Sequence, residues 1–150
     1  MLTTDPAPVG RLTVSLRPAT EAYDYDYVAQ RLADPALLVG AVAVCVFRAP
    51  FLAVPVGGTR RGGYLSVAGL LGAVEARSLL ADRHGFPHVR VCWSPYRDAC
   101  HTVEWGEPAP PWWEDDAVVG RFYGYSEAAI AAYCHRRARA GHDPPHPPAP

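Results

Sequence analysis

The stretch AVAVCVFRAPFLAVPV, residues 41–56, decides the fold because it is long, apolar and rich in β-branched side chains. The break at residues 48–50 predicts a turn and hence a β-hairpin. Pairing centred on Ala49 sets Val42 opposite Val56, Val44 opposite Val54 and Val46 opposite Leu52. The opposite face is also apolar, since it carries Cys45, Phe47, Phe51 and Ala53. We therefore expect both faces to be covered, by helices or by a partner chain.

The segments HVRVCW, residues 88–93, and HTVEW, residues 101–105, predict a second hairpin. Pairing centred on Tyr96 sets Val89 opposite Val103, Cys92 opposite Cys100 and His88 opposite Glu104. The two cysteines have two interpretations: a redox-sensitive disulfide, or two free thiols, which a reducing compartment favours. His88 and Glu104 are either an acid–base pair or an ordinary surface pair.

The remaining patterns complete an α+β fold. Alternation predicts strands at residues 12–17 and 64–65, and a strand that contains Pro55 is expected at a sheet edge or a bulge. Helices are expected at residues 20–32, 67–83 and 127–139, capped by Thr20, Ser66 and Ser126. The alternation of Tyr and Asp at residues 23–27 also permits a strand within the first of these ranges. The middle helix is predicted to bury Val67, Leu70, Leu71, Val74 and Ala81. Residues 107–116 are predicted to form a loop and residues 121–125 a short strand. This order predicts a mostly antiparallel sheet of about five to six strands with two to three packed helices.

Composition limits the classes of function. The chain has 150 residues, of which 49% are hydrophobic and 19% charged, so it can build one core. The net charge of −1 argues against nucleic-acid binding. No apolar run approaches the roughly 20 residues that span a bilayer, and the first ten residues do not resemble a secretory signal. We expect a cytoplasmic protein with a single domain at residues 11–140, between a disordered N-terminus (1–10) and a Pro-rich disordered tail (141–150).

The segment GGTRRGG, residues 57–63, is a candidate anion or ligand site. Arg60 and Arg61 supply positive charge, and Gly62 and Gly63 let backbone N–H groups approach a ligand. The alternative is a solvated turn whose glycines adopt positive φ. The spacing matches neither a P-loop nor a dinucleotide fingerprint.

Cysteine and histidine occur together at residues 100–101 and 134–135, the one pattern that suggests a metal. Adjacent residues on a strand point to opposite faces, so Cys100 and His101 are poorly placed to bind one ion. We expect no metal site, and no Ser or Cys lies in a known nucleophile signature.

The loop EPAPPWWEDD, residues 107–116, carries Trp112 and Trp113. One interpretation is an exposed partner-binding loop, since Trp is enriched at the centres of protein interfaces. The other is a loop that folds down and packs both rings on the sheet.

Three blocks, FRAPFLAVPVGGTRRGGYLSV, WSPYRDACHTVEWGEPAP and GRFYGYSEAAIA, resemble a family of small actinobacterial proteins of unknown function. The resemblance covers roughly residues 20–135. It implies no catalytic residues.

Other segments resemble GNAT-type N-acetyltransferases. LRPATEA (16–22) is similar to their first strand, LAVPVGGTRRGG (52–63) to their strand and pyrophosphate loop, and SEAAIAAY (126–133) to a helix motif. This resemblance implies acetyl-CoA as cofactor, held by residues 60–63, and Tyr133 as the acid. Leu65 stands where that loop has its final glycine, and Ser126 where the helix motif has asparagine.

The apolar hairpin and the Trp-rich loop favour a non-catalytic binding or regulatory module without a cofactor, which binds a protein partner or forms a homo-oligomer. The alternative is a GNAT-like acyltransferase that uses acetyl-CoA.

Overall fold

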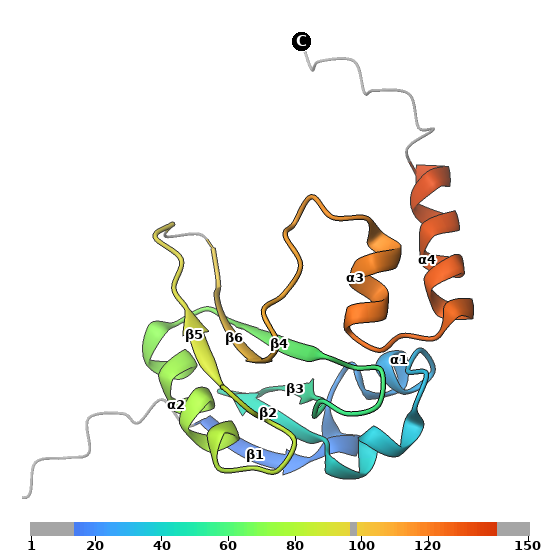
Figure 1. Cartoon of the computed structure of the whole chain (residues 1–150). Helices are drawn as coiled ribbons and strands as arrows, with labels where there is room; N and C mark the ends of the chain where they lie inside the picture. The colour runs from blue at the N-terminus through green and yellow to red at the C-terminus, as the bar shows by residue number, and fades with distance from the viewer. Residues whose placement is uncertain (1–13, 97–98, 141–150) are drawn as a thin grey trace, which may run out of the picture.

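The decisive stretch folds as a hairpin of β2, Val42–Val46, and β3, Ala49–Ala53. The computed structural model describes residues 14–96 and 99–140 (Figure 1). The turn is Phe47–Arg48, one residue earlier than predicted, and Phe47 has a φ of 58°. Val44 pairs with Phe51 instead of Val54, so the predicted register is wrong by three residues. An odd shift reverses the faces of β3, and it also leaves Pro55 beyond the end of the ladder.

Both faces of β2 are buried, as expected, and the same chain covers both. On one side Val42 and Val44 join a core with the second sheet and helix α2. On the other side Ala43 packs with Leu52 and Val54 beneath the N-terminal helical segments. The chain itself thus covers both faces of β2, while Phe47 and Phe51 of the hairpin are exposed.

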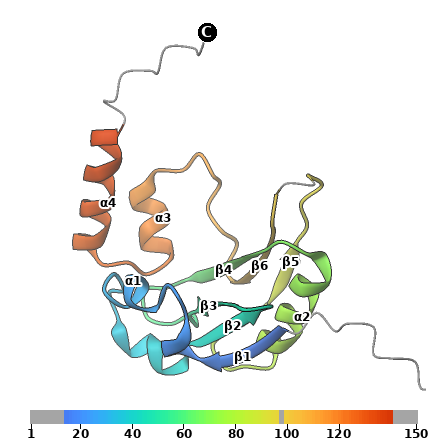
Figure 2. The same cartoon turned by 180° about the vertical axis from the view of Figure 1, so that it is seen from behind.

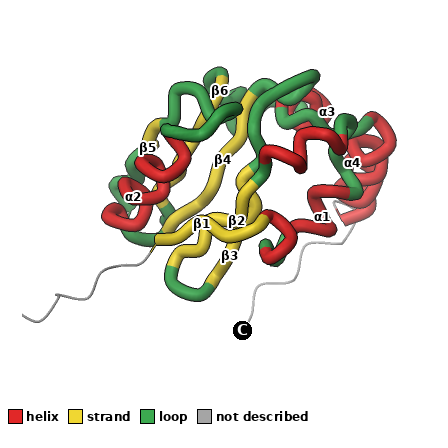
Figure 3. Tube along the Cα trace, turned by 90° about the horizontal axis from the view of Figure 1, so that it is seen from below, coloured by secondary structure: helices red, strands yellow, loops and turns green. Residues whose placement is uncertain are grey.

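The strands form two three-stranded antiparallel sheets, where one sheet was expected (Figures 1 and 3). The first has the order β1-β2-β3, with β1 at Val14–Pro18. The second has the order β4-β6-β5, with β4 at Gly62–Val67, β5 at Arg90–Cys92 and β6 at His101–Gly106. β3 and β4 are thus both edge strands. The outer edge of β3 is bonded to other groups, because the Pro50 carbonyl accepts from the Tyr23 N–H and the Leu52 N–H donates to Asp24 Oδ1.

The second hairpin forms with a register two residues away from the prediction. Val91 pairs with Val103, and Cys92 pairs with Thr102. An even shift preserves which residues share a face, and Val89, Val103 and Trp105 are buried together, whereas Trp93 is exposed. The predicted pairing of Cys92 with Cys100 is therefore wrong. The predicted pairing of His88 with Glu104 is wrong too, because Glu104 lies opposite Arg90 and forms an ion pair with it.

The N-terminal helix is broken into short pieces where one helix over residues 20–32 was predicted. These are the 3-10 helix η1 at Ala19–Glu21 and α1 at Tyr25–Ala29. A further 3-10 helix, η2, follows at Pro35–Gly40, where the Asp34 side chain accepts from the Ala36 N–H. Together these pieces cover the second face of the β2–β3 hairpin.

Helix α2, Leu70–Ala81, packs on the two sheets through its small residues. The buried positions are Gly72, Ala73, Ala76 and Leu80. The predicted apolar stripe is therefore wrong, since Leu70, Leu71 and Val74 are exposed. A Cβ atom on Gly72 would lie 3.3 Å from Val67 Cγ1, so the first turn of the helix is in close contact with the sheet at this position. Ser66 belongs to β4, and Gly69 is the N-cap.

The chain ends in two helices that lie side by side (Figures 1 and 2). α3, Asp116–Phe122, includes the first two residues of the predicted strand at 121–125, of which Tyr125 forms a β-bridge with Leu32. Asp115 Oδ1 caps α3 by accepting from the Ala117 N–H. α4, Glu127–Ala140, confirms the predicted helix, and Ser126 Oγ accepts from the Ala129 N–H. The predicted disordered ends, 1–10 and 141–150, lie outside the described residues. Among the described helices, none has the length and apolarity needed to cross a membrane.

Candidate functional site

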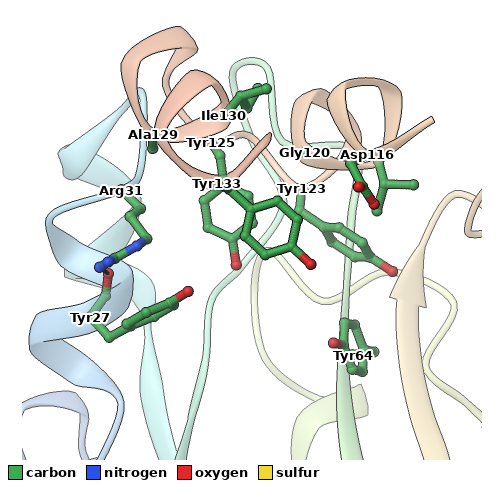
Figure 4. Close-up of a pocket in the computed structure, with 11 residues that line it drawn as sticks. Tyr27, Arg31, Tyr64, Asp116, Gly120, Tyr123, Tyr125, Ala129, Ile130 and Tyr133 are labelled. Atoms are coloured by element: carbon green, nitrogen blue, oxygen red, sulfur yellow. Dashed lines mark hydrogen bonds between the residues drawn. The ribbon is translucent and has the colours of Figure 1, made fainter. Parts of the chain in front are cut away.

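Five of the eight tyrosines line one pocket of about 320 Å³ (Figure 4). They come from four separate parts of the chain: Tyr27 from α1, Tyr64 from β4, Tyr123 and Tyr125 from the end of α3, and Tyr133 from α4. Arg31 and Asp116 also line the pocket, with apolar contributions from Val119, Ala129 and Ile130. Aromatic side chains gathered from such distant positions form a concave surface of the kind that binds small molecules.

Close packing of the α3–α4 turn brings these tyrosines together. Gly120 allows α4 to approach, because a Cβ atom there would lie 2.8 Å from Ile130 Cγ1. Gly124, with a φ of 75°, turns the chain between the helices and sits against Arg60. The Gly124 carbonyl accepts from the Ala33 N–H, and the Ser126 N–H donates to the Arg31 carbonyl. The end of the α1 region is thereby joined to the α3–α4 turn.

The hydroxyl groups of the five pocket tyrosines are available to a ligand. Within the described residues, none of them donates a hydrogen bond to another protein group. Burial, followed by the charges of Tyr64 and Glu104, raises the pKa of Tyr123 to about 12, and burial likewise raises the pKa of Tyr125. Near neutral pH these phenols are therefore protonated and can donate to an acceptor.

The two charged residues of the pocket differ in their partners. The Arg31 guanidinium stacks 3.5 Å above the centre of the Tyr27 ring, and its Nη1 donates to the Tyr27 carbonyl. It has no carboxylate partner among the described residues. Asp116, in contrast, accepts from Arg137 Nη1 at 2.8 and 2.9 Å. The positive charge of Arg31 is thus the less compensated of the two.

A second cavity of about 610 Å³ continues from the tyrosine pocket and shares Tyr64, Tyr123 and Tyr125 with it. It follows the gap between the edges of β3 and β4, and Leu52 and Leu65 are among its apolar side chains. One carbonyl links the two sheets across this gap, because Val54 O accepts from Trp105 Nε1 at 2.9 Å and from Arg60 Nε at 3.4 Å.

Arg60, a predicted anion-binding residue, is buried at the end of α3. Its side chain is 7% exposed, and Nη1 donates to the Tyr123 carbonyl at 2.8 Å. Burial lowers the pKa of Arg60, and the nearby phenols act in the opposite direction. A cation at a helix C-terminus interacts favourably with the unpaired carbonyls there. The geometry therefore gives Arg60 a structural role as a bond between the 57–60 turn and α3.

The structure places Arg61 directly before β4 and Gly62 and Gly63 at the start of this strand. The exposed Arg61 side chain pairs with Glu107, which raises the pKa of Arg61 and lowers that of Glu107. Gly62 and Gly63 belong to β4, which separates the 57–63 segment from α2. A Cβ atom on Gly62 would lie 2.7 Å from Phe122 Cε1, so close packing explains this glycine. Anion binding here stays a prediction.

Trp112 and Trp113 are exposed, so the packed-loop interpretation is wrong for these two rings. Their exposed fractions are 91% and 71%. The rings contact each other almost at a right angle, with centroids 5.7 Å apart. They do not line the tyrosine pocket.

The four cysteines are free in the described part of the chain. Burial, followed by the charge of Glu104, raises the pKa of Cys92, which keeps its thiol protonated near neutral pH. No group of three or more His, Cys, Asp or Glu within residues 14–96 and 99–140 is arranged to hold a metal ion. The Nδ1 atom of His101 accepts a hydrogen bond from the Ser94 N–H, so this imidazole nitrogen already has a protein partner.

Of the residues predicted by resemblance to acetyltransferases, only Tyr133 lines the tyrosine pocket. The sequence did not predict that Tyr27, Arg31, Tyr64, Tyr123 and Tyr125 line one pocket. A partial signal was present, because Tyr27 and Arg31 have helical i,i+4 spacing and Tyr123 and Tyr125 flank a glycine. Their convergence depends on the α3–α4 packing, which spacing alone does not reveal.

Comparison with known proteins agrees with the expected similarity to a family without an established activity. The match is to the Family of unknown function (DUF6302) and covers residues 16–149. No curated protein and no solved structure matches the chain. Because the family match spans most of the sequence, the protein belongs to the Family of unknown function (DUF6302).

Proposed function

We propose that the protein is a non-catalytic binding module for a small aromatic molecule that carries an acidic group. One observation carries this proposal: five tyrosines converge on one pocket, with hydroxyl groups that have no partner among the described residues. Aromatic walls favour a planar ring, and hydroxyl donors favour acceptor oxygens.

The aromatic part of the ligand is supported by the rings and by the apolar side chains of α3 and α4. Tyr64 and Tyr123 already contact each other, with ring centroids 5.4 Å apart and planes inclined at 58°. Each aromatic pair contributes about 0.5–1.5 kcal/mol beyond the burial of apolar area. A ring between Tyr123 and Tyr133 gains two such contacts and also covers Ile130.

The acidic group is supported by Arg31. Its guanidinium lines the pocket without a carboxylate partner in the described part of the chain, whereas Asp116 is already paired with Arg137. A carboxylate at Arg31 therefore forms a charge-assisted hydrogen bond, worth about 1.5–3 kcal/mol. A cationic ligand would instead meet Arg31 and find Asp116 occupied.

Binding is favoured over catalysis by the chemistry of the lining. Among the described residues, no Ser, Cys or His lines this pocket. The pKa of Tyr123 is about 12 and that of Tyr125 is raised, so neither is a general base near neutral pH. These phenols suit the positioning of acceptor oxygens.

The experiment compares three probes of similar size by NMR titration of the full chain: benzoate, benzamide and cyclohexanecarboxylate. We expect saturable binding of benzoate. Benzamide, which lacks the charge, and cyclohexanecarboxylate, which lacks the aromatic ring, should each bind about tenfold more weakly, the equivalent of about 1.4 kcal/mol. Absence of saturable binding by benzoate would contradict the proposal.

Substitutions then locate the site. Tyr123→Phe with Tyr133→Phe removes two hydroxyl groups and keeps the rings, while Arg31→Gln removes the charge. Both variants should weaken benzoate binding, and Arg31→Gln should remove the preference for benzoate over benzamide. Tyr96→Phe is the matched control, because Tyr96 is exposed and lies outside the pocket. Equal affinities in all variants would refute the assigned site.

A further inference from the structure

The Trp112–Trp113 pair is an exposed aromatic surface in the loop between β6 and α3. Both rings are exposed. They follow three prolines of the same loop, Pro108, Pro110 and Pro111. Neither indole N–H donates to an acceptor among the described residues. The pair thus offers two apolar ring faces at a right angle and two free donors.

The end of α4 lies close to this surface. The loop that carries the tryptophans leads directly into α3, whose first residue, Asp116, is bonded to Arg137 of α4 at 2.8 Å. Figures 1 and 2 both show the start of α3 and the end of α4 at the same end of the helical pair. The chain therefore leaves α4, after Ala140, within about one helical turn of the Asp116 contact.

The segment that follows α4 has the sequence GHDPPHPPAP, residues 141–150, with five prolines in its last seven positions. The family match continues to residue 149 and so includes nearly all of this segment. A polyproline II chain rises about 3.1 Å per residue, so ten residues reach about 31 Å. That length is ample to return from Ala140 to Trp113.

We propose that the Pro-rich segment 141–150 binds the Trp112–Trp113 pair of its own chain. Proline-rich segments bind aromatic grooves because the proline rings pack on aromatic faces and the extended backbone leaves its carbonyls free to accept from indole N–H groups. A tethered segment binds at a high effective concentration, so a weak contact suffices. This inference is independent of the aromatic ligand proposed above.

The test uses the full chain and the indole N–H resonances of its four tryptophans in NMR spectra. In the variant that combines Pro144→Ser, Pro145→Ser, Pro147→Ser and Pro148→Ser, the Trp112 and Trp113 resonances should shift. The Trp105 resonance, from a buried ring, and the Trp93 resonance, from an exposed ring on β5's side of the molecule, should not. A synthetic peptide of residues 141–150, added to this variant, should move the two resonances back toward their original positions.

Two outcomes would overturn the proposal. Unchanged Trp112 and Trp113 resonances in the variant would show that the segment does not bind them. The unsubstituted protein is also diluted. If its Trp112 and Trp113 resonances then move to the positions found in the proline variant, the bound segment belongs to a second copy of the chain. Trp112→Ala with Trp113→Ala, tested with the peptide, checks the surface independently, since both rings are exposed and the fold does not depend on them.

Discussion

Replacing Arg60 tests whether the 57–63 segment serves structure or anion binding. In Arg60→Met, the Tyr123 carbonyl loses its charge-assisted bond at 2.8 Å, worth about 1.5–3 kcal/mol. The 3.4 Å bond to Val54 O is at the outer limit of length and adds little, and that carbonyl keeps its bond from Trp105 Nε1. The methionine side chain recovers part of the apolar packing, so we expect the free energy of unfolding to fall by about 2 kcal/mol.

Urea unfolding followed by circular dichroism measures this change, and Arg61→Met is the matched control. Arg61 is the adjacent arginine but is exposed, and its contacts are a surface ion pair with Glu107 and a guanidinium position 5.7 Å from the centre of the Phe122 ring. Because such exposed contacts contribute little, its loss should leave the unfolding midpoint almost unchanged. The same two variants test the anion prediction when inorganic phosphate is added. Equal stability of Arg60→Met and the unsubstituted protein would refute the structural role of Arg60. Phosphate stabilisation that disappears in Arg61→Met would support an anion site at this segment.

Three further predictions follow from packing, titration and the alternative function. Leu80→Ala should lower the free energy of unfolding by about 2–5 kcal/mol because Leu80 is fully buried, whereas Leu71→Ala, at a position 67% exposed, should have almost no effect in the same urea titration. Stability should fall as the pH rises from about 10 to 12, since Tyr123 ionises in the unfolded chain first; Tyr123→Phe should reduce that fall, and an unchanged profile would contradict the raised pKa. Acetyl-CoA should leave the Tm unchanged in a thermal-shift assay, and a rise that saturates would favour the acyltransferase alternative.

The strands of the fold could largely be predicted from the sequence, and their exact pairing could not. A continuous apolar run located the first hairpin, and alternation of apolar and polar residues located the second. The register of the first hairpin depended on Phe47, an aromatic residue with positive φ, which favoured a two-residue turn over the Pro50 turn. Local residue preferences do not predict such a turn, since positive φ is rare for a bulky side chain.

The face of α2 that packs on the sheets was predicted wrongly because the prediction ignored how much space the buried side chains have. Periodicity assigns the largest apolar residues to the core, and on that basis Leu70 and Leu71 should be buried. The first turn of the helix packs closely on the sheets, so Gly72 and Ala73 are inside while Leu70 and Leu71 are outside. The tyrosine pocket was missed because no helix was predicted at residues 116–122, and without that helix Tyr123 has no defined neighbours.

The Val54 carbonyl has a mechanical consequence for the whole molecule. The two sheets meet at β3 and β4 without a ladder between them, and the described bonds of Arg60 and Trp105 to this one oxygen cross the junction. Separating the two sheets therefore breaks no strand pairing, but it exposes the apolar core that Val42 and Val44 share with Trp105 and that helix α2 covers. The shared apolar core, and not backbone pairing, therefore holds the two sheets together along this junction, which the second cavity follows.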